Sequence, residues 1–240
     1  SVINSTHPGA MATIIQQGVK NNFIVFGFTN ANALILNFNG KDAFFGTNPI
    51  CFGAPRGKND FYCLDMATSK ISFNKVLSFR ENNKKLNLNE VANKSGNITR
   101  DPHAANYVLP TGEYKGYGLA SMIEILCGIY SGMNYGTSIP DMFNSDMKTK
   151  RKISQFYIMI KTDAAISHKL FLNRMKNLAK EVRSAKNIKG KKVMLPNDPE
   201  TIKYKINKKR GIKIDKNVIK NIDNVCKKLK MKSFISEYQK

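Results

Sequence analysis

Glycine, proline and hydroxyl residues gather in three short segments whose composition suggests more than a structural role. The segments read GTNPICFGAP at residues 46–55, LDMATS at residues 64–69 and LPTGEYKGYG at residues 109–118. In the third segment, Lys115 stands among glycines directly before a periodic apolar run. Because a helix N-terminus offers free backbone N–H groups, a lysine beside it is predicted to help bind an anion. A purely structural turn is the alternative that these residues leave open.

Neither the histidines nor the cysteines have the spacing of a metal site. The histidines form no helix-spaced pair with another ligand, and the cysteines include no C-x-x-C pair. We therefore expect no metal, and we interpret the cysteines as small core residues. These residues are His7, His103 and His168, and Cys51, Cys63, Cys127 and Cys226. Taken with its neighbours alone, His7 is interpreted as a surface or capping histidine.

The charge of the chain raises nucleic-acid binding as a further alternative. The net charge is +22, from 39 basic and 17 acidic residues, and most of the excess lies beyond residue 147. Almost all of that excess is lysine, without an aromatic stacking motif or a recognition helix, so a solvated lysine-rich surface is favoured. A basic nucleic-acid-binding protein remains the minor alternative.

The composition favours a globular protein with a sizeable core. Hydrophobic residues make up 42% of the 240 residues, with 14 Phe and 9 Tyr. No apolar stretch has the length of a membrane span, and the first thirty or so residues lack the order of a signal peptide. We therefore expect a cytoplasmic protein with no membrane partner.

Apolar periodicity predicts helices and strands that are mixed throughout the chain. Strands are expected at residues 21–28, 33–38, 61–69 and 154–163, with a turn at Asn39-Gly40 after the second. Helices are expected at residues 10–20, from Tyr117 to Tyr130, around residues 171–182, and at residues 215–230 with Asp215 as N-cap. The helix after Tyr117 is predicted to bury an apolar stripe of Leu119, Met122, Ile123, Leu126, Ile129 and Tyr130. Residues 80–101 are polar and turn-rich, and we interpret them as a surface excursion.

This pattern indicates an α/β (α+β mixed) fold that is not doubly wound. Strands do not alternate cleanly with crossover helices, and no G-x-G-x-x-G follows a strand. A nicotinamide cofactor, if bound, would be held by another kind of fold.

Taken in order, several motifs resemble the malate/L-lactate dehydrogenase family of the second type, which is a non-Rossmann group. They read NSTHPGA, GFTNA, GTNPICFGAP, LDMATS, ITRDPHAA, LPTGEYKGYGLASMIEILCGIYSG and VMLPND, and they cover nearly all of the chain. The run from Gly112 to Gly132 is especially specific. The family also contains ureidoglycolate, sulfolactate and diketogulonate dehydrogenase relatives.

The resemblance implies an oxidoreductase that moves a hydride between NAD or NADP and C2 of a small 2-oxo or 2-hydroxy acid. It also implies the family's own NAD(P)-binding fold and a homodimer with the active site near the subunit interface. Residues 1–240 then form a partial domain. The cofactor-binding region is expected over about residues 10–160 and a C-terminal helical part over about residues 161–240, the latter packing with a missing N-terminal region.

The resemblance also assigns roles to single residues. His7 occupies the position of the family's acid/base histidine, a role that suits an imidazole because it titrates near neutrality. Lys115 and Tyr114 match one cofactor contact. The other expected cofactor contacts are Asn30, Ala31, Asp65, Met66, Ala67, Asn197 and Asp198. Possible supporting residues are Asn48, Asp101 and Glu124, for which a turn, a loop-holding role and a structural hydrogen-bond acceptor are the respective alternatives.

The sequence also departs from the family. LPND replaces the family's L-P-G-E, but Asn197 can adopt a left-handed turn as glycine does, and Asp198 keeps the carboxylate. The family's segment before the histidine motif, which grips the substrate carboxylate, has no counterpart here, and Arg56 and Arg100 are unconvincing substitutes. We therefore expect a fragment with poor activity on its own. An inactive relative that serves as a binding or assembly module is the alternative from another class.

Overall fold

The computed structural model describes residues 1–57, 60–142, 144–146 and 148–233. The chain divides into two compact units, Ser1–Asn197 and Asp198–Lys240. These two units differ from the predicted cofactor-binding and helical regions, whose boundary is expected near residue 160. That predicted division stays a prediction. All elements named as parts of the candidate site, apart from Asp198, belong to the first unit.

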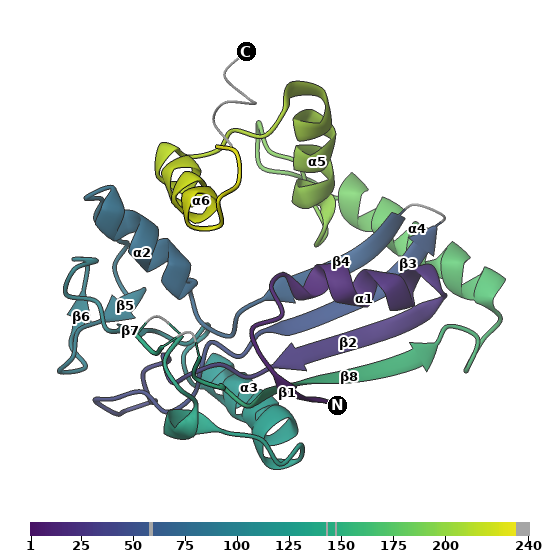
Figure 1. Cartoon of the computed structure of the whole chain (residues 1–240). Helices are drawn as coiled ribbons and strands as arrows, with labels where there is room; N and C mark the ends of the chain where they lie inside the picture. The colour runs from purple at the N-terminus through teal and green to yellow at the C-terminus, as the bar shows by residue number, and fades with distance from the viewer. Residues whose placement is uncertain (58–59, 143, 147, 234–240) are drawn as a thin grey trace. The chain divides into compact units, whose positions relative to one another are not determined.

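An antiparallel sheet organises the first unit (Figure 1). Its strand order is β1-β8-β2-β3-β4, and every neighbouring pair is antiparallel. The strands are β1 (Val2–Ser5), β2 (Phe23–Thr29), β3 (Ile50–Gly57), β4 (Asp60–Met66) and β8 (Ile153–Lys161). The predicted strands at 21–28, 61–69 and 154–163 are confirmed as β2, β4 and β8, and the mixed, non-Rossmann fold is confirmed by the antiparallel sheet.

Helix α1 (Met11–Lys20) covers one face of this sheet, as the periodicity of residues 10–20 predicts. Its buried side chains Met11, Ile15 and Val19 pack on strand residues of β2, β3 and β4. The helix comes so near that a Cβ at Gly53 would lie 2.8 Å from Ile15 Cδ1, so glycine permits the close approach. Cys51 and Cys63 belong to this core, which confirms their predicted role as small core residues.

The opposite face is covered in part by α3 (Tyr114–Glu124), which continues as the π-helix η1 (Ile125–Ile129). The predicted helix is confirmed, but the predicted buried stripe is wrong for four of its six residues. Leu119, Met122, Ile129 and Tyr130 are 37% to 73% exposed. Ile123 is fully buried and Leu126 is partly buried, as predicted. The other buried apolar residues on this side of the helix are small, which lets its backbone approach the sheet and the loops beneath it; they are Gly116, Ala120, Cys127 and Gly128.

Most residues of the segment 80–101 are exposed, as its polarity predicts, but the segment also contains short strands and a few buried residues. It joins helix α2 (Phe73–Glu81) to a small sheet of order β6-β5-β7, made of β5 (Val91–Ala92), β6 (Ile98–Thr99) and β7 (Tyr107–Val108). Leu86, Val91 and Ala92 are fully buried, and Leu86 and Val91 belong to a core shared with Val76 and Val108. A few apolar residues among many polar ones were enough to build this core.

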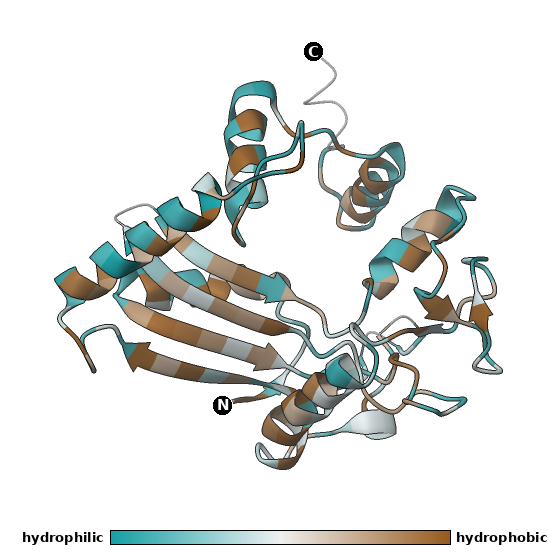
Figure 2. Ribbon diagram, turned by 180° about the vertical axis from the view of Figure 1, so that it is seen from behind, coloured by the Kyte–Doolittle hydropathy of each residue, from teal (hydrophilic) through white to brown (hydrophobic). Residues whose placement is uncertain are grey.

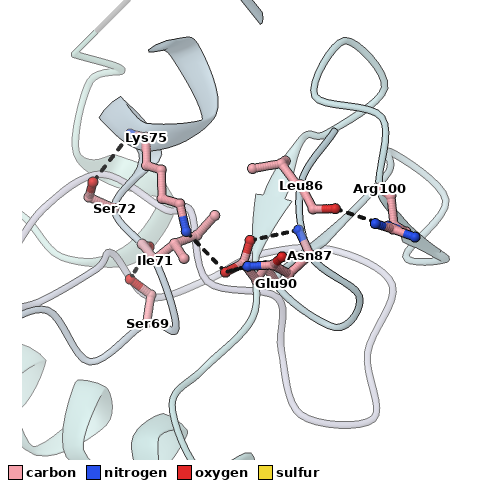
Figure 3. Close-up of polar contacts among 8 residues, drawn as sticks. All are labelled: Ser69, Ile71, Ser72, Lys75, Leu86, Asn87, Glu90 and Arg100. Carbon is pink, nitrogen blue, oxygen red and sulfur yellow. Dashed lines mark hydrogen bonds and ion pairs between the residues drawn. The ribbon is translucent and has the colours of Figure 1, made fainter. Parts of the chain in front are cut away.

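Polar contacts hold the same segment against α2 (Figure 3). Lys75 Nζ lies 3.1 Å from Glu90 Oε1, and the backbone N–H of Asn87 donates to Glu90 Oε2. Arg100 Nε donates to the Leu86 carbonyl oxygen at 3.0 Å. We call α2, the β6-β5-β7 sheet and the loops between them the small lobe. Several polar residues of this segment therefore make internal contacts of the small lobe.

Three further expectations concern the remaining parts of the first unit. Residues 33–38 do not form the predicted strand. Ile35 and Leu36 are buried, but they make only isolated bridges, Ile35 to Val108 and Leu36 to Ala43. The predicted turn at Asn39-Gly40 is present. Helix α4 (His168–Ser184) confirms the helix expected around residues 171–182 and packs on β3.

The second unit contains α5 (Asp198–Arg210) and α6 (Lys216–Lys228). The predicted N-cap of α6 is confirmed, since the Asp215 carboxylate accepts from the Asn217 backbone N–H at 2.8 Å. Within the described residues, no helix is both long and apolar enough to span a membrane.

Candidate active site

The strand register brings most of the predicted site residues to one end of the large sheet, where three strands end and two begin. We call this end the site edge, or simply the edge. Ser5 pairs with Ile153, Thr29 with Gln155, and Ile50 with both Phe28 and Met66. The ends of β1, β2 and β4 therefore meet the starts of β8 and β3. The predicted residues at this edge are His7, Asn30, Ala31, Asn48, Asp65, Met66 and Ala67.

The glycine-rich turn before α3 is tied to the same edge. The Thr111 backbone N–H donates to the Thr68 carbonyl at 2.9 Å, directly after Ala67. Gly112 has φ +57°, which lets the chain turn into the helix. Lys115 and Tyr114 in the first helical turn are exposed, with the ammonium 6.0 Å from the centre of the Tyr114 ring. The anion site predicted from the sequence is thus set beside the end of β4.

His7 is held in an exposed position just beyond β1. Gln155 Nε2 donates to Ser5 Oγ at 2.9 Å and secures the end of the strand. The Gly9 backbone N–H donates to His7 Nδ1 at 3.0 Å, so in this arrangement the neutral ring carries its proton on Nε2. Partial desolvation, together with repulsion from Arg151, lowers the pKa of His7. The lowered pKa favours the neutral imidazole, in which Nδ1 accepts from Gly9 and Nε2–H is the remaining donor.

Asp65 joins the end of β4 to the start of α1. Its Oδ2 accepts from the Ala12 backbone N–H at 2.9 Å, which satisfies one of the unpaired donors of the helix N-terminus. Since only Pro8, Gly9, Ala10 and Met11 separate His7 from Ala12, the carboxylate also limits where His7 can lie.

A buried polar cluster of Asn30, Asn48 and Glu124 lies beneath this edge. Asn48 Nδ2 donates to Glu124 Oε2 at 2.6 Å, and Asn48 Oδ1 accepts from the Ala31 backbone N–H at 3.0 Å. Glu124 Oε1 accepts from the Gly136 N–H at 2.7 Å. Burial raises the pKa of Glu124, while the hydrogen bonds from Gly136, Asn48 and Asn30 partly offset that rise.

The side chains of this cluster are satisfied by protein partners and therefore act as positioning groups. Asn30 Nδ2 donates to the Asn134 carbonyl at 2.9 Å, and Asn30 is 1% exposed. This geometry matches the structural alternatives for Asn48, a turn residue, and for Glu124, a hydrogen-bond acceptor. Direct contact of Asn30 with a cofactor stays a prediction.

Three predicted residues lie elsewhere. Asp101 Oδ1 accepts from the His103 backbone N–H at 2.9 Å, in the turn after β6, so the carboxylate holds a loop. Asn197 has φ +76°, which confirms the predicted left-handed turn, and its side chain donates to the Phe61 carbonyl. Phe61 is near the far end of β4 from Met66, and Asp198 begins α5 in the second unit. Cofactor contacts of Asn197 and Asp198 remain predictions.

Arg151 is the residue at this edge that sequence reasoning missed. One residue, Lys152, separates it from the start of β8, and its Nη2 donates to Asn32 Oδ1 at 2.8 Å. Arg56 and Arg100, which the sequence raised, are engaged with Asp60 and with the Leu86 carbonyl. The available signal was a single arginine in a lysine-rich run immediately before a strand.

The antiparallel fold and the residues gathered at one end of its sheet resemble those of the non-Rossmann class of dehydrogenases. Comparisons with known proteins agree with this class. The family model for malate/L-lactate dehydrogenase matches residues 1–223. The chain belongs to the malate/L-lactate dehydrogenase family. The predicted resemblance is thereby confirmed.

Individual relatives support the assignment. The chain is 30% identical over 209 residues to the ureidoglycolate dehydrogenase (NAD(+)) of Escherichia coli K12, covering 87% of this chain and 60% of that protein. It is 30% identical over 230 residues to the malate/(S)-sulfolactate dehydrogenase of Methanothermus fervidus, covering 94% and 65%. The solved sulfolactate dehydrogenase of Methanocaldococcus jannaschii superposes with a TM-score of 0.84 at 27% identity, covering 99% of this chain and 68% of that one. The chain thus spans 60% of the length of the first of these relatives and 65% of the length of the second.

Proposed function

We propose that this protein is an NAD(P)-dependent oxidoreductase that transfers a hydride between the nicotinamide and C2 of a small 2-oxo or 2-hydroxy acid. The observation that carries the proposal is the position of His7. Its free Nε2–H lies at the same sheet edge as the Asp65–Ala67 strand end, Ala31 and the Lys115 turn. The family relatives named as dehydrogenases of ureidoglycolate, malate and sulfolactate lend further support.

The residues present fit a dinucleotide. Its negatively charged phosphates suit the exposed Lys115 ammonium and the first backbone N–H groups of α3. The end of β4 from Asp65 to Ala67 adjoins that turn through the Thr111–Thr68 hydrogen bond and would line the cofactor. The loop at Asn30 and Ala31 would approach the nicotinamide. The bound cofactor supplies the hydride.

His7 manages the proton that accompanies the hydride. In the reduction direction the ring must first be the imidazolium, which requires that the hydrogen bond from Gly9 to Nδ1 be released. The Nε2 proton then passes to the substrate carbonyl oxygen as negative charge grows there, and a neutral ring with its proton on Nδ1 remains. In the oxidation direction the ring accepts the hydroxyl proton at Nε2, which requires that Nδ1 bear a proton and the hydrogen bond from Gly9 be released. The exposure of His7 leaves room for a substrate beside it.

The test of this function is turnover by the protein with a panel of 2-oxo acids, followed by loss of nicotinamide absorbance. His7→Ala is expected to slow turnover by about 10² to 10⁴-fold, the usual contribution of a general acid–base group. His103→Ala, which removes an exposed histidine of the small lobe, is the matched control and should retain full activity. Equal rates for the wild type and His7→Ala would contradict the proposal.

We further propose that the protein is a homodimer formed through the sheet face opposite α1 (Figure 2). That face carries Phe26 and Phe52, whose ring centroids are 4.7 Å apart, and the 41% and 42% exposed Ile158 and Ile160. Such an apolar face on the protein surface is typical of an interface. Light scattering after gel filtration should give twice the chain mass for the wild type and the chain mass for Ile158→Lys. Leu88→Lys, at an exposed site of the small lobe, should leave the dimer intact.

A further inference from the structure

The segment that carries His7 is not held by regular strand pairing. The register of β1 against β8 shifts between Val2 and Ser5, and Asn4 within this shift has φ +53°. A left-handed residue inside a shifted register bends the strand and interrupts the ladder of backbone hydrogen bonds. His7 lies two residues beyond the end of β1. Its position therefore depends on side-chain contacts to the residues that precede it.

Gln155 of β8 supplies those contacts. Its Nε2 donates to Ser5 Oγ at 2.9 Å and makes a longer contact of 3.5 Å to the carbonyl oxygen of Thr6, the residue directly before His7. Because a carbonyl oxygen can only accept, the NH₂ side of the amide must face β1. Gln155 is 8% exposed, so these hydrogen bonds are largely shielded from competing water.

The amide of Gln155 is itself fixed by Tyr157, two residues along the same strand. The Tyr157 hydroxyl donates to Gln155 Oε1 at 2.8 Å. Residues two apart on a strand point to the same face of the sheet, and Tyr157 packs against the core that α1 covers. Both sides of the amide thus have protein partners, and a buried amide with partners on both sides is held in one orientation.

Gln155 also connects two parts of the site edge. Its backbone pairs with Thr29 of β2, the residue before the loop at Asn30 and Ala31 that would approach the nicotinamide. Its side chain holds the residues before His7, while Asp65 accepts from the first turn of α1 beyond His7. The segment that carries the imidazole is therefore tethered on both sides.

We propose that Gln155 is a positioning residue that sets where the His7 imidazole lies relative to the nicotinamide and the substrate. This inference rests on the proposed function. Gln155 acts through Ser5 and Thr6 rather than through contact with the reacting atoms. Proton transfer needs the ring within hydrogen-bond reach of the substrate oxygen, and a displacement of about 1 Å can cost about 10²-fold in rate.

Turnover and cofactor binding by Gln155→Met test the proposal. Methionine has a similar length but cannot donate to Ser5 or accept strongly from Tyr157. We expect kcat for reduction of a 2-oxo acid to fall about ten- to hundredfold, with NADH affinity unchanged because the Lys115 turn is untouched. Gln17→Met, at an exposed glutamine of α1, is the matched control and should keep the kcat of the wild type.

A double-mutant cycle shows whether Gln155 acts through Ser5. Ser5→Ala removes one acceptor of the amide and leaves the Thr6 carbonyl, so kcat should fall less than in Gln155→Met. The double variant should be no slower than Gln155→Met, because both changes remove the same contact. If Gln155→Met does not fold, Ser5→Ala provides the same comparison with the wild type.

NMR titration of the His7 ring tests the positioning without requiring turnover. Release of the tether should expose the ring to water, so its titration midpoint should rise toward the ordinary value near 6.5 in Gln155→Met and stay unmoved in Gln17→Met. A glutamine with only a structural role would lower the urea midpoint of unfolding and leave the His7 titration unchanged. An unmoved His7 midpoint in folded Gln155→Met, or a kcat equal to that of an active wild type, overturns the proposal. Failure of the proposed function shows differently, as a wild type that binds no NADH or a His7→Ala variant that is as active as the wild type.

Discussion

The amide of Asn48 donates to the carboxylate of Glu124 across 2.6 Å, and both side chains are almost completely buried. This contact joins the segment before β3 to α3, directly beneath the edge that holds the candidate active site. Asn48 also accepts from the Ala31 backbone and donates to the Ala120 carbonyl. One asparagine therefore holds the loop after β2 and the helix that follows the Lys115 turn in fixed positions.

Removing this amide should destabilise the protein strongly. Asn48→Ala leaves the Ala31 N–H, the Ala120 carbonyl and Glu124 Oε2 short of a partner, at a cost of about 3 kcal/mol or more. Glu124→Gln should cost about 2 kcal/mol, because the new amide N–H₂ faces a donor on one side. Urea denaturation measures both values. Asn82→Ala at an exposed helix end is the control and should stay within about 0.5 kcal/mol of the wild type.

Asp65 should contribute both to stability and to the placement of His7. Asp65→Ala removes the acceptor of the Ala12 N–H and is expected to cost about 1 kcal/mol, as for other helix caps. Asp65→Asn keeps an acceptor oxygen and should cost less. If the carboxylate also helps to place His7, kcat will fall in Asp65→Ala by more than the stability change explains. Unchanged stability and kcat in Asp65→Ala would rule out this role.

Lys115 should govern cofactor affinity. Lys115→Gln removes the exposed cation at the N-terminus of α3 and is expected to weaken NADH binding about tenfold, since phosphate contacts depend on such charges. The effect should shrink at high salt because exposed charges are screened. Fluorescence titration measures the affinity. Lys20→Gln, at the C-terminal end of α1 and the opposite end of the sheet, should bind NADH as the wild type does.

The ionisation of His7 predicts a specific pH dependence. Because desolvation and Arg151 lower its pKa from the ordinary value near 6.5, His7 stays neutral as the pH falls below 7. The neutral ring accepts the proton in hydroxy-acid oxidation, so kcat/KM for oxidation should remain level down to below pH 6.5 and then decline. NMR titration of the His7 ring gives the same midpoint directly. In Arg151→Gln the midpoint should move to higher pH, and an unmoved midpoint would show that Arg151 does not act on the ring.

The lowered pKa of His7 also determines how its contribution to folding stability changes with pH. A histidine whose pKa is lower in the folded state binds fewer protons there than in the unfolded state at pH values between the two pKa values. Its contribution to stability is therefore fully present above the unfolded value near 6.5 and declines as the pH falls toward the folded value. Denaturation of the wild type and His7→Ala across this window separates the contribution of His7 from that of other groups.

Most of the large sheet and its helices could be predicted from apolar period alone. Met11, Ile15 and Val19 recur at helical spacing, and residues 23–29 form a β-branched and aromatic run, so α1 and β2 follow from local pattern. The buried residues within 80–101 and the buried side of the helix after Tyr117 could not be predicted in this way. In the segment, Leu86 and Val91 share a core with Val76 of α2 and Val108 of β7, which are distant along the chain. In the helix, Ala120 and Cys127 are buried beside Ile123, while Leu119, Met122, Ile129 and Tyr130 of the predicted stripe are exposed.

The sequence by itself determined the family, the positions of several helices and strands along the chain, and the candidacy of His7, Asp65 and Lys115, because these reside in contiguous motifs. Only the tertiary structure decided that Asn30, Asn48 and Glu124 are buried partners of one another and that Arg151 stands beside His7. The physical reason is that hydrogen bonding and electrostatic coupling depend on distance in space. An antiparallel sheet brings residues 7, 30, 48, 65 and 151 to one edge although they are far apart along the chain.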